Sequence, residues 1–181
     1  MKVVFMGTPE FSVPCLERLV SDGHDVAAVY TQPDKPKGRG YTLQPPPVKV
    51  YATEQGLPVY QPNTLRGEEF ANLLEELSPD LIIVVAYGKI LPVNVLEYPK
   101  YGCINVHASL LPKYRGAAPI QRVIIEGEKE SGVTIQQMNE GIDTGDILMV
   151  REYKVEPKET GGSLFDKLEK IWDEYDVYTK R

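Results

Sequence analysis

Cysteine and histidine are both scarce in this 181-residue sequence. The two cysteines, Cys15 and Cys103, lie far apart and form no Cys-x-x-Cys pair, and the two histidines, His24 and His107, are also dispersed. This spacing indicates neither a disulfide framework nor a metal site. We therefore expect two small, buried cysteines in a reducing compartment and no bound metal.

Long apolar runs and an excess of positive charge are missing as well. No segment approaches the length of a membrane span, and the opening residues turn polar too early for a signal peptide. The net charge is −6, so contact with a nucleic acid would need a local basic patch. A chain with 42% hydrophobic and 25% charged residues is typical of one globular domain. We expect a cytoplasmic monomer without a membrane partner.

Two glycine-based motifs are absent. Gly7 follows the first apolar run, but the pattern Gly-x-Gly-x-x-Gly does not occur there, which disfavours a nicotinamide-binding domain. Ser109 lacks the Gly-x-Ser-x-Gly elbow, so a hydrolase triad has weak support.

Short β-rich apolar runs alternate with segments of helical periodicity. The runs expected as strands cover residues 2–6, 25–30, 57–60, 80–86, 102–107, 133–138 and 147–155. Helices are expected after residue 9 and over residues 48–55, 68–77, 119–126 and 163–178, with a long loop over 33–47. This order predicts an α/β fold with a doubly wound, mostly parallel sheet flanked by helices. Ligands bind such sheets at the carboxyl ends of the strands.

The two histidines differ in position. His24 lies in a polar turn and is interpreted as a surface residue, whereas His107 ends a predicted strand and shares one face with Asn105. From position alone, His107 is either a structural, hydrogen-bonded histidine or a catalytic one. An amide that donates to an oxyanion and an imidazole that moves a proton would suit acyl transfer. Asp143 is the best candidate to orient the imidazole. Asp146 is its rival, although a turn-forming aspartate before a strand is the commoner interpretation of that residue.

The sequence around this pair resembles a known family. Residues 105–121, Asn-Val-His-Ala-Ser-Leu-Leu-Pro-Lys-Tyr-Arg-Gly-Ala-Ala-Pro-Ile-Gln, resemble the signature of formyltransferases that use 10-formyltetrahydrofolate. The resemblance implies a Rossmann-like formyltransferase fold and assigns catalytic roles to Asn105 and His107. The Asp-x-Gly motif at residues 143–145 implies the same for Asp143.

Other stretches resemble the methionyl-tRNA formyltransferases in particular. These are Met-Gly-Thr-Pro-Glu-Phe at residues 6–11 and the inserted loop at residues 32–40 with Pro-Val-Lys at 47–49. The resemblance further implies a set of residues that bind the formyl donor: Tyr87, Gly88, Ile90, Leu91, Ser109, Leu110, Leu111, Pro112, Asn139 and Gly141.

The inserted loop is a basic island in an acidic chain. Residues 33–50 carry four cations against the one carboxylate of Asp34, which gives a local charge of +3, and the cations are Lys35, Lys37, Arg39 and Lys49. By resemblance, these residues bind the acceptor stem of the initiator tRNA. Without the resemblance, an ordinary solvated loop would be the simpler interpretation.

The resemblance predicts the domain organisation and the activity. A catalytic domain is expected over residues 1–170, followed by an atypical tail at 171–181, and the β-barrel domain that follows in the family is missing from this sequence. The expected reaction is formyl transfer to methionyl initiator tRNA. The alternatives are transfer to an amino sugar or nucleotide amine, or a truncated chain that binds folate or tRNA with little activity.

Overall fold

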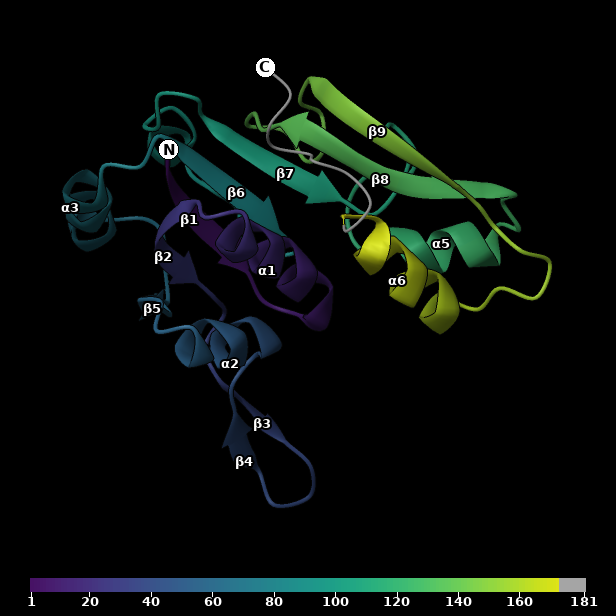
Figure 1. Cartoon of the computed structure of the whole chain (residues 1–181), viewed down its shortest axis with the longest axis horizontal. Helices are drawn as coiled ribbons and strands as arrows, with labels where there is room; N and C mark the ends of the chain where they lie inside the picture. Colours follow the sequence, from purple (N-terminus) through teal and green to yellow (C-terminus); the bar gives the residue numbers. More distant parts are fainter. Residues whose placement is uncertain (173–181) are drawn as a thin grey trace. The chain divides into compact units, whose positions relative to one another are not determined.

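The computed structural model describes residues 1–172, and the chain divides into two compact units, residues 1–103 and residues 104–181. Each unit combines strands and helices (Figure 1). Within the described range, no helix is both long and apolar enough to cross a membrane.

Unit 1 is built on parallel strands in the order β5-β2-β1-β6. Their bounds are β1 (Lys2–Gly7), β2 (Asp25–Tyr30), β5 (Val59–Tyr60) and β6 (Leu81–Val85). The central strands β1 and β6 are almost wholly apolar and buried, as expected of strands covered on both faces. At the end of β1, a Cβ added to Gly7 would lie 2.9 Å from the carbonyl oxygen of Val85, so this turn requires glycine.

Helices follow the strands of unit 1, all but one of them at the expected positions. They are the 3-10 helix Glu10–Ser12, α1 (Val13–Ser21), α2 (Pro47–Glu54), α3 (Glu68–Leu77) and the short α4 (Val93–Leu96), which the sequence analysis did not predict. Both α1 and α2 carry proline in the first turn, where the missing N–H has no helical partner to lose.

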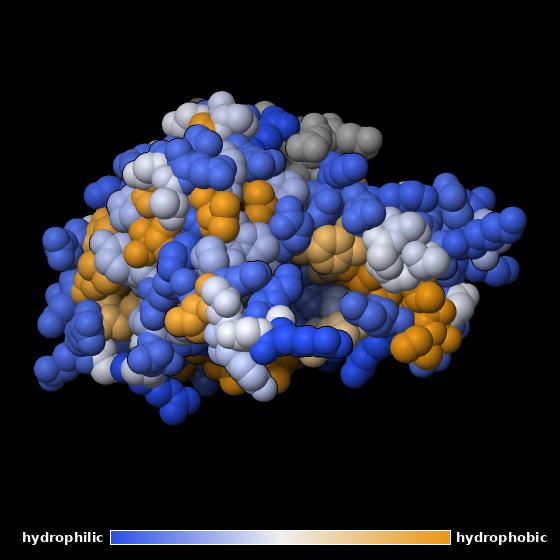
Figure 2. All heavy atoms as spheres, turned by 90° about the horizontal axis from the view of Figure 1, so that it is seen from below, coloured by the Kyte–Doolittle hydropathy of each residue, from blue (hydrophilic) through white to orange (hydrophobic). Residues whose placement is uncertain are grey.

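The segment predicted as a long loop is instead a β-hairpin. Strands β3 (Lys35–Lys37) and β4 (Thr42–Gln44) pair antiparallel, and all six of their residues are exposed. The hairpin projects from its unit below α2 (Figure 1). The face of the molecule seen in Figure 2 is mainly hydrophilic, with separate hydrophobic patches. No apolar alternation marked these strands, because neither face of the hairpin is buried.

Unit 2 departs from the parallel pattern. Strands β7 (Cys103–His107), β8 (Glu130–Gln137) and β9 (Ile147–Lys154) pair antiparallel, so a short loop suffices between β8 and β9. The helices are α5 (Pro119–Ile125), α6 (Gly161–Glu169) and the 3-10 turn Lys170–Trp172. The helix expected over 163–178 is thus present to residue 169, and residues 173–178 lie outside the described range. The α/β class is confirmed, with the parallel strands in unit 1.

Candidate active site

Strand β7 presents Asn105 and His107 on one face, as the alternation of side chains along a strand requires. His107 is only 8% exposed, and Asn105 is half-buried. The next strand supplies a third polar side chain on this face. Gln136 of β8 stands directly opposite Asn105 in the antiparallel register, so the two amides project from the same side of the strand pair.

The two ring nitrogens of His107 face different partners. Nε2 lies 2.7 Å from the backbone carbonyl oxygen of Tyr114, and Nδ1 lies 3.6 Å from Oδ2 of Asp143. A carbonyl can only accept a hydrogen bond, so we assign a proton to Nε2, which donates it to the Tyr114 carbonyl. Nδ1 is therefore the nitrogen that can gain or lose a proton, and it sits beside a carboxylate.

The carboxylate of Asp143 is held by three donors. Gln136 Nε2 donates to Oδ1 at 2.8 Å, the backbone N–H of Gly116 donates to Oδ2 at 2.8 Å, and Asn105 Nδ2 lies 3.4 Å from Oδ1. The backbone of Asp143 is left-handed, with φ of 51°, a conformation that aspartate tolerates better than most residues. Asp143 thus brings its side chain back to β7, as its position in the loop predicted.

The loop around Asp143 is tightly closed. Asn139 Oδ1 accepts from Thr144 Oγ1 at 2.7 Å and from the N–H of Gly141 at 3.0 Å. A Cβ on Gly145 would lie 1.6 Å from the carbonyl oxygen of Gln137, so no other residue fits there. The rival Asp146 is exposed and contributes its backbone carbonyl to Gln137 N–H at 2.8 Å. Of the two candidate aspartates, the structure brings Asp143 to the imidazole.

Ser109 shapes the segment that carries the Tyr114 carbonyl. It is fully buried, and its Oγ donates to the carbonyl of Tyr114 at 3.2 Å and accepts from the N–H of the same residue at 3.0 Å. The hydroxyl of Tyr114 donates to Glu128 Oε1 at 2.6 Å, which ties the segment to the residues after α5. These contacts explain Ser109 without a nucleophilic role.

The other donor-binding residues predicted in unit 2 vary in exposure. Pro112, Asn139 and Gly141 are exposed, Leu110 is half-buried and Leu111 is 8% exposed. The N–H of Leu111 donates to Thr134 Oγ1 at 3.1 Å, which anchors this segment on β8.

The donor-binding residues predicted in unit 1 follow β6. Ile90 is 76% exposed, whereas Tyr87 and Leu91 are buried. Burial raises the pKa of Tyr87 to about 12, and its carbonyl accepts from Thr8 Oγ1 at 3.0 Å and from Gln32 Nε2 at 3.2 Å. The side chains of Tyr87 and Leu91 therefore act in the core, while Ile90 and the backbone at Gly88, with φ of 85°, face solvent.

The four cations of the basic island separate into two kinds. Lys35, Lys37 and Arg39 lie on the hairpin, are exposed, and have no acidic partner within residues 1–172. Lys49 lies on α2, and its ammonium contacts both carboxylate oxygens of Asp34 at 2.9 Å. The structure thus brings three of the four together as free charges.

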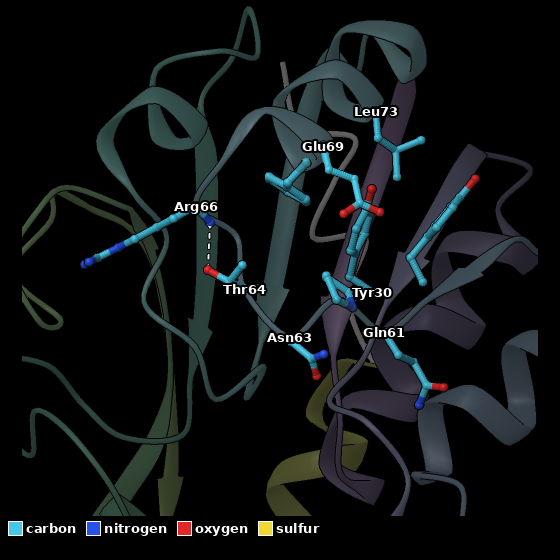
Figure 3. Close-up of a pocket in the computed structure, with 10 residues that line it drawn as sticks. Tyr30, Gln61, Asn63, Thr64, Arg66, Glu69 and Leu73 are labelled. Carbon is cyan, nitrogen blue, oxygen red and sulfur yellow. Dashed lines mark hydrogen bonds between the residues drawn. The ribbon is translucent and has the colours of Figure 1, made fainter.

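A cavity of about 540 Å³ opens in unit 1 (Figure 3). Its lining includes Tyr30, Asn63, Arg66 and Glu69, and none of the predicted site residues lines it. Tyr30 is fully buried against the rings of Tyr60 and Phe70, so the cavity has an aromatic floor, and Arg66 points away from it in Figure 3. Among the residues that the structure describes, no cluster of three or more His, Cys, Asp or Glu residues could hold a metal ion.

Three elements of the site were missed by sequence reasoning. The Tyr114 carbonyl and the Gly116 N–H are backbone groups, and no residue type signals them. Gln136 became visible only through its pairing with Asn105, which requires the antiparallel register of β7 and β8.

Comparisons with known proteins identify the family and support the fold. A model of the formyl transferase family matches residues 1–179, and the chain belongs to this family. The chain is 56% identical, over 168 residues, to the methionyl-tRNA formyltransferase of Alkaliphilus oremlandii, an alignment that covers 93% of this chain and 54% of the relative. A methionyl-tRNA formyltransferase of Geobacter metallireducens gives the same identity and coverage. The chain spans about half the length of the curated relatives it matches.

Solved structures support the fold independently. The phosphoribosylglycinamide formyltransferase of Bacillus halodurans superposes with a TM-score of 0.77 at 20% identity, covering 99% of this chain and 100% of that one. A sugar N-formyltransferase from Shewanella gives a TM-score of 0.68 at 21% identity, covering 94% and 64%. At this level of identity, the likeness concerns the fold alone.

Proposed function

We propose that the protein transfers the formyl group of 10-formyltetrahydrofolate to the α-amine of methionyl initiator tRNA. The observation that carries the proposal is the cluster of Asn105, His107 and Asp143, which closes within unit 2 through contacts of 3.4 and 3.6 Å. The identity of 56% to two methionyl-tRNA formyltransferases supports the choice of substrate.

In the proposed reaction, the amine attacks the carbon of the formyl group. A C–N bond forms, and the carbonyl electron pair moves to oxygen. The amide of Asn105 and the protonated imidazole of His107 donate to this oxyanion, where fixed donors contribute most to catalysis. The oxyanion then collapses, the bond from the formyl carbon to N10 of the folate breaks, and the electron pair of that bond goes to N10.

The proton follows the opposite path to the formyl group. Protonated His107 first gives its Nδ1 proton to N10 as the bond from the formyl carbon to N10 breaks. The neutral Nδ1 then takes a proton from the positively charged amine, which restores the imidazolium. Nδ1 of His107 is the relay atom, because Nε2 keeps its proton on the Tyr114 carbonyl at 2.7 Å. Asp143, 3.6 Å from Nδ1, orients the ring and stabilises its cationic form during the transfer. The reaction needs no covalent enzyme intermediate.

The RNA substrate is assigned to the hairpin. Lys35, Lys37 and Arg39 are exposed and unpaired within the described residues, so they are free to meet phosphates. This feature favours tRNA over an amino sugar or a nucleotide amine, which are the second candidate substrates. Three further properties remain predictions: a catalytic domain that ends at residue 170, a monomeric state, and a location in the cytoplasm, where aminoacyl-tRNA is used.

The test is the rate of formylmethionyl-tRNA formation by the purified chain with 10-formyltetrahydrofolate and methionyl initiator tRNA. His107→Ala is expected to lower this rate by several orders of magnitude, because it removes the proton relay. His24→Ala, which removes the other histidine, is the matched control and should retain the rate. Near-normal turnover by His107→Ala would refute the catalytic role.

The same assay separates the alternatives. Arg39→Ala should impair transfer to tRNA but leave transfer to a small amine unchanged if the hairpin binds RNA. Folate binding without any transfer, to tRNA or to a small amine, would identify a binding remnant instead of an enzyme.

A further inference from the structure

A half-buried ion pair closes the base of the β3–β4 hairpin. Asp34 immediately precedes β3, and Lys49 lies in the first turn of α2, shortly after β4. The Lys49 ammonium lies 2.9 Å from each carboxylate oxygen of Asp34, and the two side chains are 29% and 27% exposed. The pair therefore joins the entry and the exit of the hairpin.

Gln61 completes this arrangement from the end of β5. Its Oε1 accepts from Lys49 Nζ at 2.9 Å, and its Nε2 donates to Asp34 Oδ1 at 2.8 Å and to the carbonyl of Gln32 at 2.9 Å. Figure 3 shows the Gln61 side chain extending away from Tyr30 and Glu69 rather than toward them. The hydrogen bonds from Gln61 and Lys49 hold the pKa of Asp34 below its ordinary value of 3.8, so the carboxylate is charged at neutral pH.

The hairpin beyond this base has little else to fix its direction. Every residue of β3 and β4 is exposed, and at the tip Tyr41 is 80% exposed. An isolated two-stranded hairpin is marginally stable in water, so its orientation depends on contacts at its base. The cations that it carries can meet RNA phosphates at fixed positions only if that base is held.

We propose that Lys49 is a positioning residue and not a phosphate contact. Together with Asp34 and Gln61 it forms a clamp that fixes the hairpin, so that Lys35, Lys37 and Arg39 are presented to the RNA in a set geometry. This inference rests on the proposed RNA-binding function. It assigns a role to Asp34, the one carboxylate within the basic island.

The direction in which Asp34→Asn changes the affinity for RNA distinguishes the clamp from a simple effect of net charge. If the island acts only through its net charge, Asp34→Asn removes a repulsive charge and strengthens RNA binding. If the clamp positions the hairpin, Asp34→Asn weakens binding, by about threefold to tenfold, because the pair with Lys49 is lost. The measurement is the Kd for methionyl initiator tRNA at several salt concentrations, and unchanged or tighter binding by Asp34→Asn overturns the clamp.

The salt dependence provides a matched comparison of two lysines. Lys35→Met, at an exposed and unpaired hairpin residue, should lower the slope of log K against log salt by about 0.7 to 0.9, as for one lost phosphate contact. Lys49→Met should weaken binding but leave that slope unchanged, and Lys49→Arg should restore the affinity. A slope that falls equally for both methionine variants would make Lys49 a phosphate contact and refute the proposal.

A second measurement does not depend on RNA. Hydrogen exchange of the peptide covering residues 33–46 should be faster by about threefold or more in Lys49→Met and Asp34→Asn, because the hairpin opens more often. Lys35→Met should exchange like the unaltered protein. If the unaltered protein does not bind tRNA, the proposed function is refuted, but the hydrogen-exchange rates still show whether the clamp holds the hairpin. Unchanged exchange in both clamp variants overturns the clamp by itself.

Discussion

Replacing Gln136 by methionine tests whether Asp143 must be held for the reaction to proceed. Gln136 is 2% exposed, and its Nε2 donates to Asp143 Oδ1 at 2.8 Å. Its other amide atom, Oε1, is buried and has no hydrogen-bond partner within the described residues. Methionine has a similar length and removes both amide atoms, so the substitution changes polarity with little change in shape.

The expected effects on stability and on turnover differ. Losing the hydrogen bond to the carboxylate costs about 1.5–3 kcal/mol, while removing the unpaired oxygen recovers about 1–3 kcal/mol. The two changes largely cancel, so the free energy of unfolding should shift by no more than about 2 kcal/mol. In the variant, the Asp143 carboxylate keeps its hydrogen bond from the Gly116 N–H but loses the one from β8. We expect the carboxylate to be misoriented as a result, at a cost of about 1.4–2.7 kcal/mol in the transition state, which lowers kcat about 10- to 100-fold.

The assay is formyl transfer at saturating donor and tRNA, with urea unfolding of the same preparations. Gln121→Met is the control, because Gln121 is an exposed glutamine on α5 of the same unit, and it should change neither quantity. A Gln136→Met variant with normal kcat would show that Asp143 needs no support from β8. A variant that loses kcat only because it unfolds would show that the amide serves the core instead.

Three further predictions follow from single contacts. Ser109→Ala should lower the free energy of unfolding, measured by urea titration, by about 1–3 kcal/mol, because it removes both side-chain contacts to Tyr114. The variant should still show measurable formyl transfer. Complete loss of transfer in a folded variant would reopen a nucleophilic role for Ser109. The pKa of Asp34 is lower in the folded protein than its ordinary value of 3.8, so the ionised carboxylate stabilises the fold above pH 3.8, and this stabilisation is lost as the pH falls through the folded pKa. Hydrogen exchange of residues 33–46, corrected for intrinsic rates, should therefore show constant protection from pH 7 to 5 and less protection only below pH 3.8. A loss of protection near pH 6 would contradict this. Burial raises the pKa of the Cys103 thiol to about 12, so alkylation by iodoacetamide at pH 8 should be slow until denaturant is added, and rapid labelling of the native protein would argue against the buried position.

Sequence periodicity predicted the elements that bury a face. Strand β6 was expected from its continuous apolar run, and α3 from the helical spacing of Phe70 and Leu74, both of which are buried. The hairpin at residues 35–44 was missed because it is exposed on all sides, and α4 because a four-residue helix is too short to show a period. Hydrophobic pattern reports burial, so elements that bury little leave no pattern to read.

Charge counting was a weaker guide to individual residues than geometry. It grouped Lys49 with three hairpin cations and treated Asp34 as a minor offset to the charge of the island. The structure pairs these two residues at 2.9 Å and leaves the other three cations exposed. Because a sum of charges contains no positions, it cannot distinguish a cation that meets a ligand from one that is already neutralised by a neighbour.

The direction of β8 decides more about the candidate site than any single side chain. In an antiparallel pair, a shift of register by one residue would turn Gln136 to the opposite face from Asn105. Asp143 would then lose its donor from β8, although every residue of the Asn–His–Asp signature would still be present. The signature therefore identifies which groups can react, whereas the antiparallel return of β8 against β7 fixes where the carboxylate stands. The alternation of strands and helices predicted a mostly parallel sheet, but it gave no sign that β8 returns antiparallel to β7.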